Sequence, residues 1–480
     1  MKRFVDRIEE LSALDEEYRR PEASLVVVYG RRRVGKTELL SEFIKGKRAL
    51  YFLATEESIV ENRNSFRLAV AEFTQQGLLR SGNQFSWDVL FEQTAQAGTD
   101  DEKVIIVLDE FQYLGKAEKA FPSILQRTWD TQLRNKRVML ILCGSLISMM
   151  EEQALSYSSP LYGRRTAQFK LQQIPFSYYH EFFADAAPMD GRRLIEYYSV
   201  TGGVPKYVEL FRPHSTVYDA IDRNILRRDS YLYEEPRFLL QNEVQEVGTY
   251  FSIIKSIAAG NRKLGQIGGV LETKVTNLTR PLKTLVDLDI LEREVPVTEE
   301  KPETCKQGQY KIKDNFLAFW FQFVFPYQSF IEGGHPEIVS SRIRANLIKN
   351  HTAYVYEDIC RQSVWDRIGR GEFPALYNRV GRWWGNRDVE IDIVALDTVG
   401  RNDILFGECK FYESAPVGAD VLTSLQAKAK SVSWGNTDRR ETFVIFSETG
   451  FSGALIELAQ QQGNVKLLSC SLDYLKVNLI

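Results

Sequence analysis

The chain has 480 residues, too many for one hydrophobic core, so we expect three or four domains. Hydrophobic residues make up 44% and charged residues 26%, a balance typical of globular proteins, and no apolar run approaches the roughly 20 residues that cross a bilayer. The N-terminus lacks the apolar stretch of a signal peptide, and the five cysteines lack the paired spacing of a zinc site or a disulfide framework. We therefore expect a cytoplasmic protein without membrane contact, and the net charge of −3 does not by itself indicate a nucleic-acid binder.

The strongest local motif is a glycine-rich loop between a predicted strand at 25–29 and a predicted helix at 38–44. It reads GRRRVGKT and fits the pattern GxxxxGK[ST]. Backbone N–H groups of such a loop, with the start of the next helix, cradle phosphates. Lys36 would reach the β- and γ-phosphates of ATP, and Thr37 would bind Mg²⁺. The residues predicted to contact the nucleotide are Gly30, Arg31, Arg32, Arg33, Val34, Gly35, Lys36, Thr37 and Glu38.

Two further apolar strands end in polar residues that complete this site. The strand at 103–108 runs into Asp109 and Glu110, which matches a Walker B strand after a Walker A loop. Asp109 would hold Mg²⁺ through water, and Glu110 would orient or deprotonate the attacking water. The strand at 137–143 ends near Ser145, which either contacts the γ-phosphate or caps the helix that begins at Leu146. The sequence leaves both roles open.

Several phrases resemble the archaeal-type ATPases of the AAA+ superfamily, in the branch of signal-transduction ATPases with numerous domains. They are YGRRRVGKTEL, VIIVLDEFQYL, LILCGSLISMM, SPLYGRRT, the Phe4–Arg7 stretch, Gly202–Pro205 and YEEPRFLL. The resemblance implies an α/β P-loop ATPase of the ASCE type, a helical lid, a winged helix and a C-terminal domain of unknown function. The corresponding boundaries are 1–168, 169–245, 246–330 and 337–480.

The same resemblance assigns two arginine positions. Arg164 or Arg165 would sense the γ-phosphate, on its own chain or on a neighbouring chain of a homo-oligomer, and a structural salt bridge is the alternative. The turn at Gly202–Pro205 lies where other AAA+ proteins carry a second sensing arginine. This sequence has no arginine there, so we expect slow, switch-like hydrolysis.

The middle of the chain predicts helices with aromatic packing at 170–245 and then a winged-helix order. Helices at 251–258, 264–270 and 276–288 precede strands at 290–297 and 310–312. The third helix has basic and polar residues on it or beside it that suit DNA phosphates or base edges. They are Lys274, Asn277, Arg280 and Lys283. The alternative is a winged helix that packs only against protein.

Polar residues recur on predicted elements beyond the break at Gly333–Pro336. Glu357 lies on a helix at 342–367, Asp392 on a strand at 389–395, and Glu408 and Lys410 on a strand at 404–411. If the turn between these strands is symmetric about Gly400, the numbers of paired residues sum to 800, which sets Asp392 opposite Glu408. Lys410 shares the face of Glu408 because the two are two residues apart. Facing carboxylates beside a lysine suit a divalent metal.

This arrangement resembles the PD-(D/E)xK nuclease superfamily, with a restriction-endonuclease-like α/β fold, although Ile391 stands where the motif has proline. By that resemblance Glu357, Asp392 and Glu408 bind Mg²⁺ or Mn²⁺, Lys410 positions or activates water, and Gln426 is an accessory residue. Trp383 and Trp384 are predicted to pack in the core rather than stack on bases. We therefore expect an ATP-dependent regulator coupled to a nuclease-like domain that acts on DNA. The alternative is a non-cleaving switch or scaffold that binds nucleic acid or protein.

Overall fold

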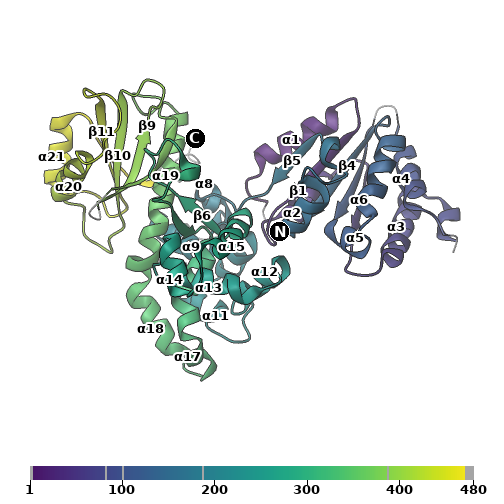
Figure 1. Cartoon of the computed structure of the whole chain (residues 1–480), viewed down its shortest axis with the longest axis horizontal. Coiled ribbons are helices and arrows are strands. Elements are labelled where there is room, and N and C mark those ends of the chain that lie inside the picture. Colours follow the sequence, from purple (N-terminus) through teal and green to yellow (C-terminus); the bar gives the residue numbers. More distant parts are fainter. Residues whose placement is uncertain (1–3, 82–83, 100–101, 186–188, 386–388, 471–480) are drawn as a thin grey trace. The chain divides into compact units, whose positions relative to one another are not determined.

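The computed structural model describes residues 4–81, 84–99, 102–185, 189–385 and 389–470. The chain forms two compact units (Figure 1). Unit 1 extends to Ile174 and includes Val204–Lys206, and unit 2 contains Pro175–Gly203 and everything from Tyr207 onward. Within these described ranges, no helix has both the length and the apolar character needed to cross a membrane. The finer division into four domains stays a prediction.

Unit 1 is built on a five-stranded sheet in which every pairing is parallel. Its strand order is β2-β3-β4-β1-β5. The strands are β1 (Ser24–Tyr29), β2 (Ala49–Leu53), β3 (Val104–Asp109), β4 (Val138–Gly144) and β5 (Ala167–Lys170). Strands β1, β3 and β4 are buried along their whole length, as is usual where helices cover both faces of a parallel sheet. Because the strands are parallel, the carboxyl ends of β1, β3 and β4 meet at one edge.

The helices of unit 1 pack around this sheet (Figure 1). They are α1 (Ile8–Arg19), α2 (Lys36–Phe43), α3 (Ile59–Thr74), α4 (Trp87–Gln96), α5 (Gln112–Ala117), α6 (Phe121–Thr128) and α7 (Ile147–Met150). Leu14 of α1 and Phe43 of α2 share a buried cluster with Val26 and Ile141 of the central strands. Helix α2 therefore starts directly after the P-loop and is fixed against the sheet by its own apolar face.

Unit 2 begins with helices and a two-stranded hairpin. The helices are α8 (Phe176–Tyr179), α9 (Gly191–Thr201), α10 (Pro205–Phe211, whose first two residues belong to unit 1), α11 (Val217–Asn224), α12 (Glu235–Glu243), α13 (Val247–Ala258), α14 (Leu264–Val270) and α15 (Val275–Asp287). The hairpin strands β6 (Leu291–Glu294) and β7 (Gln309–Ile312) pair antiparallel. The predicted helix at 264–270 has the bounds of α14, and its neighbours differ from prediction by one to four residues.

A long helical segment leads from this region into the C-terminal sheet. Helices α16 (Asn315–Phe319) and α17 (Gln328–Glu332) precede α18 (Pro336–Leu347), which continues through a π-helical turn at Ile348–Thr352 into α19 (Ala353–Gly369). The predicted helix at 342–367 is therefore part of a longer run. Its start at Pro336 is explained by the fixed φ of proline, which favours the first turn of a helix.

The C-terminal sheet is mixed, with the order β12-β11-β10-β9-β8. Its strands are β8 (Arg379–Trp384), β9 (Glu390–Leu396), β10 (Asp403–Lys410), β11 (Arg440–Ser447) and β12 (Val465–Leu468). Strands β8, β9 and β10 pair antiparallel, and β10, β11 and β12 pair parallel. Helices α20 (Ala419–Ala429) and α21 (Gly453–Gln462) cover one face, and α19 covers the other (Figure 1).

The register predicted for the β9–β10 hairpin is confirmed. Ile404 pairs with Leu396, and Gly407 pairs with Ile393, so the residue numbers of each pair sum to 800. Trp383 lies in the apolar core of this sheet, which confirms its predicted packing role, although its strand β8 was not predicted. Val297, from the connector between β6 and β7, is buried in the same core and donates its backbone N–H to the Arg382 carbonyl at 2.9 Å.

His351 in the π-helical turn generates a stability prediction. Its Nε2 lies 2.6 Å from the Ser199 carbonyl of α9, and burial lowers the pKa of His351 to about 4. Since the pKa is depressed on folding, the unfolded chain binds a proton first, and stability falls as the pH falls below about 6.5. We expect this group to make the protein about 2 kcal/mol less stable at pH 5 than at pH 7.

Chemical denaturation at pH 7 and pH 5 measures this loss. The matched variant is His351→Gln, which keeps a side-chain donor but cannot titrate, and its stability should depend less on pH. An equal pH dependence in the two proteins would show that His351 is not the group responsible.

Candidate functional site

The P-loop of unit 1 has the backbone conformation that its glycines permit. Gly35 has a φ of 97° and Gly30 a φ of 151°, and a Cβ on Gly30 would lie 2.5 Å from the Leu171 carbonyl oxygen. Lys36 Nζ donates to the carbonyl oxygens of Gly30 and Arg31, each at 2.9 Å. The ammonium group therefore lies over the loop, where a nucleotide phosphate would meet it.

An arginine outside the motif supports this loop. Arg7 is buried, and its Nη2 donates to the Val34 carbonyl at 3.0 Å and to the Gln172 carbonyl at 2.6 Å. It thus ties the P-loop to the segment that follows β5. The Phe4–Arg7 stretch is part of the resemblance to archaeal-type ATPases, but the sequence did not predict this supporting role of Arg7. Pro205 also approaches the loop, with its Cγ 3.9 Å from where a Cβ on Gly35 would lie.

The two predicted magnesium ligands lie together at the ends of their elements. Thr37, at the start of α2, donates its hydroxyl to Asp109 Oδ2 at 3.1 Å. Tyr51 of β2 donates to the same carboxylate oxygen, a contact that sequence reasoning missed because it depends on the pairing of β2 with β3. The side chains present suit Mg²⁺, which prefers hydroxyl, carboxylate and water oxygens.

The predicted catalytic carboxylate, Glu110, is held by two polar side chains. Ser145 donates its hydroxyl to Glu110 Oε2 at 2.7 Å, and Gln112 donates its amide to the same oxygen. The N-cap position of α7 is Leu146 rather than Ser145. Gln112 was also missed, although its place two residues after Glu110 was visible in the sequence.

The remaining residues of the predicted phosphate loop surround this centre. Arg32 Nη2 donates to the Tyr113 hydroxyl at 2.9 Å, and Arg31 is buried. Arg33 has a φ of 70°, which bends the loop between its two glycines. Glu38 is exposed in the first turn of α2.

Arg164 and Arg165 lie far from the P-loop of their own chain. They precede β5, whose register pairs Ala167 with Val26, so Arg165 is level with the start of β1 while the P-loop follows its end. Six residues of strand separate these levels, roughly 20 Å. This distance argues against a phosphate-sensing role on the same chain, and it leaves the predicted role on a neighbouring chain and the alternative of a structural salt bridge.

The two arginines differ in their partners. Arg164 makes a bidentate contact with Asp130, with Nε 2.9 Å from Oδ1 and Nη2 2.7 Å from Oδ2. This is the structural salt bridge considered as an alternative. Arg165 contacts Gln168 Oε1 at 2.6 Å and pairs with no acidic residue among those that the structure describes. Arg165 is therefore the better candidate for a role in another chain.

In unit 2, the β9–β10 hairpin brings the predicted carboxylates together. Asp392 Oδ2 accepts the backbone N–H of Cys409 at 2.9 Å, which holds it beside Glu408. Lys410 Nζ donates to Glu408 Oε1 at 2.9 Å. Adjacent residues of β10 point to opposite faces, so Glu408 faces α20 while Cys409 faces α19.

A second lysine on Glu408 was not predicted. Lys428 of α20 donates to both carboxylate oxygens of Glu408 at 3.0 Å. Gln426, the predicted accessory residue, donates its amide to Gln462 of α21 at 2.7 Å rather than to Glu408. Lys428 stands three residues after the buried Leu425, on the same side of the helix. The apolar stripe of α20 therefore indicated in the sequence which side faces the sheet.

The carboxylates raise one another's pKa values. Burial and the Asp392 carboxylate raise the pKa of Glu357 to about 7, although Arg382 Nη2 lies 3.0 Å from Glu357 Oε2. Burial and the Glu408 carboxylate raise the pKa of Asp392. Such repulsion between acids is relieved by a bound cation, so these side chains fit a divalent metal. In the described part of the chain, however, no three acidic, histidine or cysteine side chains already form a metal-binding group.

Lys410 stays an ammonium group in this setting. Burial acts to lower its pKa, but the Glu408 carboxylate outweighs burial, so the pKa of Lys410 is raised. Of the two predicted roles, the charge suits positioning of water rather than its deprotonation.

Comparisons with known proteins agree with this architecture. The family described as an ATPase domain predominantly from Archaea matches residues 4–211, and a family of proteins of unknown function from archaea and bacteria matches residues 320–427. The Walker-type ATPase paby2304 of Pyrococcus abyssi shares the fold, with a TM-score of 0.51 and 21% identity over 66% of this chain and 96% of that one. Unit 1 is accordingly a P-loop ATPase domain, which confirms the predicted resemblance to archaeal-type ATPases.

Two proteins of Methanocaldococcus jannaschii are similar in sequence. Uncharacterized protein MJECL04 is 35% identical over 408 residues, which cover 85% of this chain and 87% of that protein. Uncharacterized ATP-binding protein MJ0423 is 47% identical over 45 residues, 9% of this chain and 76% of that protein. The chain belongs to the same family as MJECL04, and its residues 4–211 match the archaeal ATPase domain.

The contacts of Glu110 lead to a prediction about hydrolysis. Glu110→Gln keeps the size and the hydrogen bonds of the side chain but removes its basic carboxylate. We expect ATP affinity within about twofold of wild type and a single-turnover hydrolysis rate lower by about 100-fold or more. Ser145→Ala, which removes only the supporting hydroxyl, should give a smaller loss. A Glu110→Gln protein that hydrolyses ATP at the wild-type rate would exclude this residue as the water-activating group.

The position of Arg165 predicts hydrolysis shared between chains. Arg165→Ala should lower the ATPase rate by about 100-fold or more without changing stability, because an arginine supplied by a neighbour stabilises transition-state charge. Arg164→Ala, the matched variant, should cost about 1 kcal/mol of stability through loss of its partner Asp130.

A mixing experiment separates this role from a local one. Arg165→Ala keeps an intact P-loop, and Lys36→Ala keeps an intact arginine, so an equimolar mixture should recover activity that neither variant has alone. A mixture as inactive as its components would exclude a role in a neighbouring chain.

Proposed function

We propose that this protein is an ATP-hydrolysing regulator whose C-terminal domain cleaves DNA with a divalent metal. The observation that carries the proposal is the hairpin register that brings Asp392 and Glu408 together with Lys410 beside them. Glu357 joins this group from α19, through its electrostatic interaction with Asp392. The C-terminal domain is then a PD-(D/E)xK nuclease-like domain.

In unit 1, the proposed roles follow from the contacts around the P-loop. Lys36 binds the β- and γ-phosphates of ATP, and Thr37 and Asp109 hold Mg²⁺. Glu110, oriented by Ser145 and Gln112, accepts the proton of the attacking water.

In unit 2, Glu357, Asp392 and Glu408 would hold Mg²⁺ or Mn²⁺, which supplies a polarised water and a Lewis acid for the phosphodiester. Lys410 keeps its proton, orients the water and stabilises negative charge on the phosphate. Lys428 also lies on Glu408 and would add positive charge at the same place. Both lysines suit a substrate that develops negative charge in the transition state.

The region from α13 to β7 supports a DNA contact. Three helices followed by a hairpin are the order of a winged helix, and the hairpin packs against α19 through Lys311 and Asp358. Because the hairpin is occupied by α19, we expect α15 to be the element that contacts DNA. The exposed polar residues at its N-cap and along it make no ion pair with an acid among the residues that the structure describes; they are Lys274, Asn277, Arg280 and Lys283.

The second candidate function is a non-cleaving ATP-dependent scaffold. One observation favours it: Glu408 already has two ammonium partners, Lys410 and Lys428, which would compete with a metal. In that case the carboxylates and lysines form a structural network, and the domain only binds its partner.

Cleavage of plasmid and linear DNA with Mg²⁺ or Mn²⁺ tests the two functions. We expect nicking by the wild type that falls by at least about 100-fold in Lys410→Ala, because the variant loses charge stabilisation at the phosphate. Loss of cleavage in Lys36→Ala as well would demonstrate control by ATP.

The matched variant is Lys430→Ala, which removes an exposed lysine at the C-cap of α20; the lysines that pair with Glu408 in the described part of the chain are Lys410 and Lys428. It should cleave like wild type. An absence of cleavage under all conditions, with ATPase activity intact, would favour the scaffold.

A further inference from the structure

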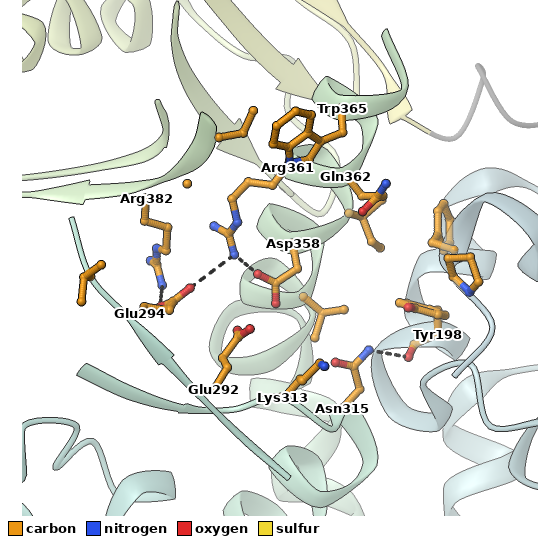
Figure 2. Close-up of a pocket in the computed structure, with 17 residues that line it drawn as sticks. Tyr198, Glu292, Glu294, Lys313, Asn315, Asp358, Arg361, Gln362, Trp365 and Arg382 are labelled. Carbon is orange, nitrogen blue, oxygen red and sulfur yellow. Dashed lines mark hydrogen bonds and ion pairs between the residues drawn. The ribbon is translucent and has the colours of Figure 1, made fainter. Parts of the chain in front are cut away.

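A cavity of about 510 Å³ lies within unit 2 beside the carboxylates. Its walls come from the β6–β7 hairpin, from α19 and from β8 (Figure 2). The charged side chains that line it are Glu292, Glu294, Lys313, Asp358, Arg361 and Arg382. This volume is in the range of ligand pockets, so it suits a segment of a strand rather than a whole duplex.

Two arginines of the cavity wall also touch the proposed metal ligands. Arg382 Nη2 lies 3.0 Å from Glu357 Oε2. Arg361 Nη1 donates to the Asp392 backbone carbonyl at 3.2 Å. A group bound between these guanidinium groups would therefore lie next to the carboxylates.

The hairpin places one acid between the two arginines. Figure 2 shows the Glu294 carboxylate between the guanidinium groups, and Oε1 and Oε2 lie 3.8 Å from nitrogens of Arg361 and Arg382 respectively. These contacts are longer than the 2.7–2.9 Å of a tight guanidinium–carboxylate pair. Arg361 also forms a closer ion pair with Asp358, and Arg382 one with Glu357, so Glu294 is the weaker partner of each arginine. A phosphate oxygen could replace the Glu294 carboxylate and bind the two guanidinium groups more closely.

An aromatic residue stands beside the same arginines. Trp365 lines the cavity next to Gln362 and is 40% exposed, an unusual position for a large apolar side chain (Figure 2). A tryptophan beside cationic side chains is the arrangement that binds unpaired nucleotides, since bases stack on the ring while phosphates meet the cations.

We propose that this cavity binds a single strand of nucleic acid, with a base on Trp365 and a phosphate on Arg361 and Arg382, and that Glu294 occupies the two arginines when no strand is bound. The inference rests on the proposed nuclease function, for which it names an unpaired strand as the substrate. Binding of the strand displaces the Glu294 carboxylate from the arginines and leaves the phosphodiester beside Glu357 and Asp392.

Fluorescence anisotropy with short labelled oligonucleotides tests this in EDTA, where no cleavage occurs. Glu294→Gln should bind a single strand about tenfold more tightly, since a competing negative charge is removed. Trp365→Ala should bind it roughly fivefold to a hundredfold more weakly, since a stacked base is lost. Trp365→Phe keeps an aromatic ring and controls for a folding defect. Its affinity for the single strand should lie between that of the wild type and that of Trp365→Ala.

The matched control is Glu303→Gln, which changes the charge equally at an exposed position of the connector between β6 and β7, outside the cavity. Its affinity should equal that of the wild type. An equal gain in Glu294→Gln and Glu303→Gln, an unchanged affinity in Trp365→Ala, or tighter binding of duplex than of single strand would each overturn the proposal. Separate titrations with DNA and RNA oligonucleotides show which kind of single strand the cavity binds.

The failure of the strand site and the failure of the nuclease proposal give different results. Variant-sensitive binding without cleavage in Mg²⁺ would overturn the nuclease and keep the strand site. Cleavage that persists unchanged in Trp365→Ala, with unchanged binding, would overturn the strand site and keep the nuclease.

Discussion

Charges that are buried away from water must be neutralised by one another, and unit 2 depends on this requirement. Lys311 on the hairpin is held by Glu292 and Asp358, Arg361 and Arg382 are shared by Glu294 and the carboxylates, and Glu408 is held by two lysines. A buried charge without its partner costs several kcal/mol, so removal of one member disturbs the next. The network therefore joins the hairpin, α19 and the C-terminal sheet into one electrostatic unit.

The ATPase unit meets a different constraint. Its polar residues lie at the ends of three parallel strands, and their positions follow from strand order rather than from pairing of charges. Three separate segments meet here through hydrogen bonds: Thr37 donates to Asp109, and Ser145 donates to Glu110, the residue after Asp109. The two centres are thus built by different means, one by the topology of a sheet and the other by mutual neutralisation.

Local patterns in the sequence were sufficient for some of these features. The P-loop, the hairpin register and the bounds of α14 depend on residues close together in the chain, where spacing and periodicity determine the geometry. The position of Arg165 depends on β5, a short strand without a clear pattern that pairs with β1 far away in sequence.

The contacts of Glu408 and the cysteines show the same limit. The apolar stripe of α20 indicated the side of the helix that faces the sheet, but the contact of Lys428 with Glu408 depends on how the helix packs there. The spacing of Gln426 and Lys430 directed the prediction to the other side of the helix. Cys360 and Cys470 are 110 residues apart, yet their sulfur atoms are 3.4 Å apart. Long-range packing of this kind leaves no trace in local spacing.

The burial of Val297 has a consequence for how the protein can be divided. This valine comes from the connector between β6 and β7, but its side chain completes the apolar interior of the C-terminal sheet. A fragment that starts at residue 337 would lack this valine and would expose the apolar surface around Gly381 and Trp383. Burial of a valine side chain contributes about 1.5–3 kcal/mol to the free energy of unfolding, and the fragment would lose this contribution. The piece of chain that can fold alone is therefore larger than the piece that carries the C-terminal motif.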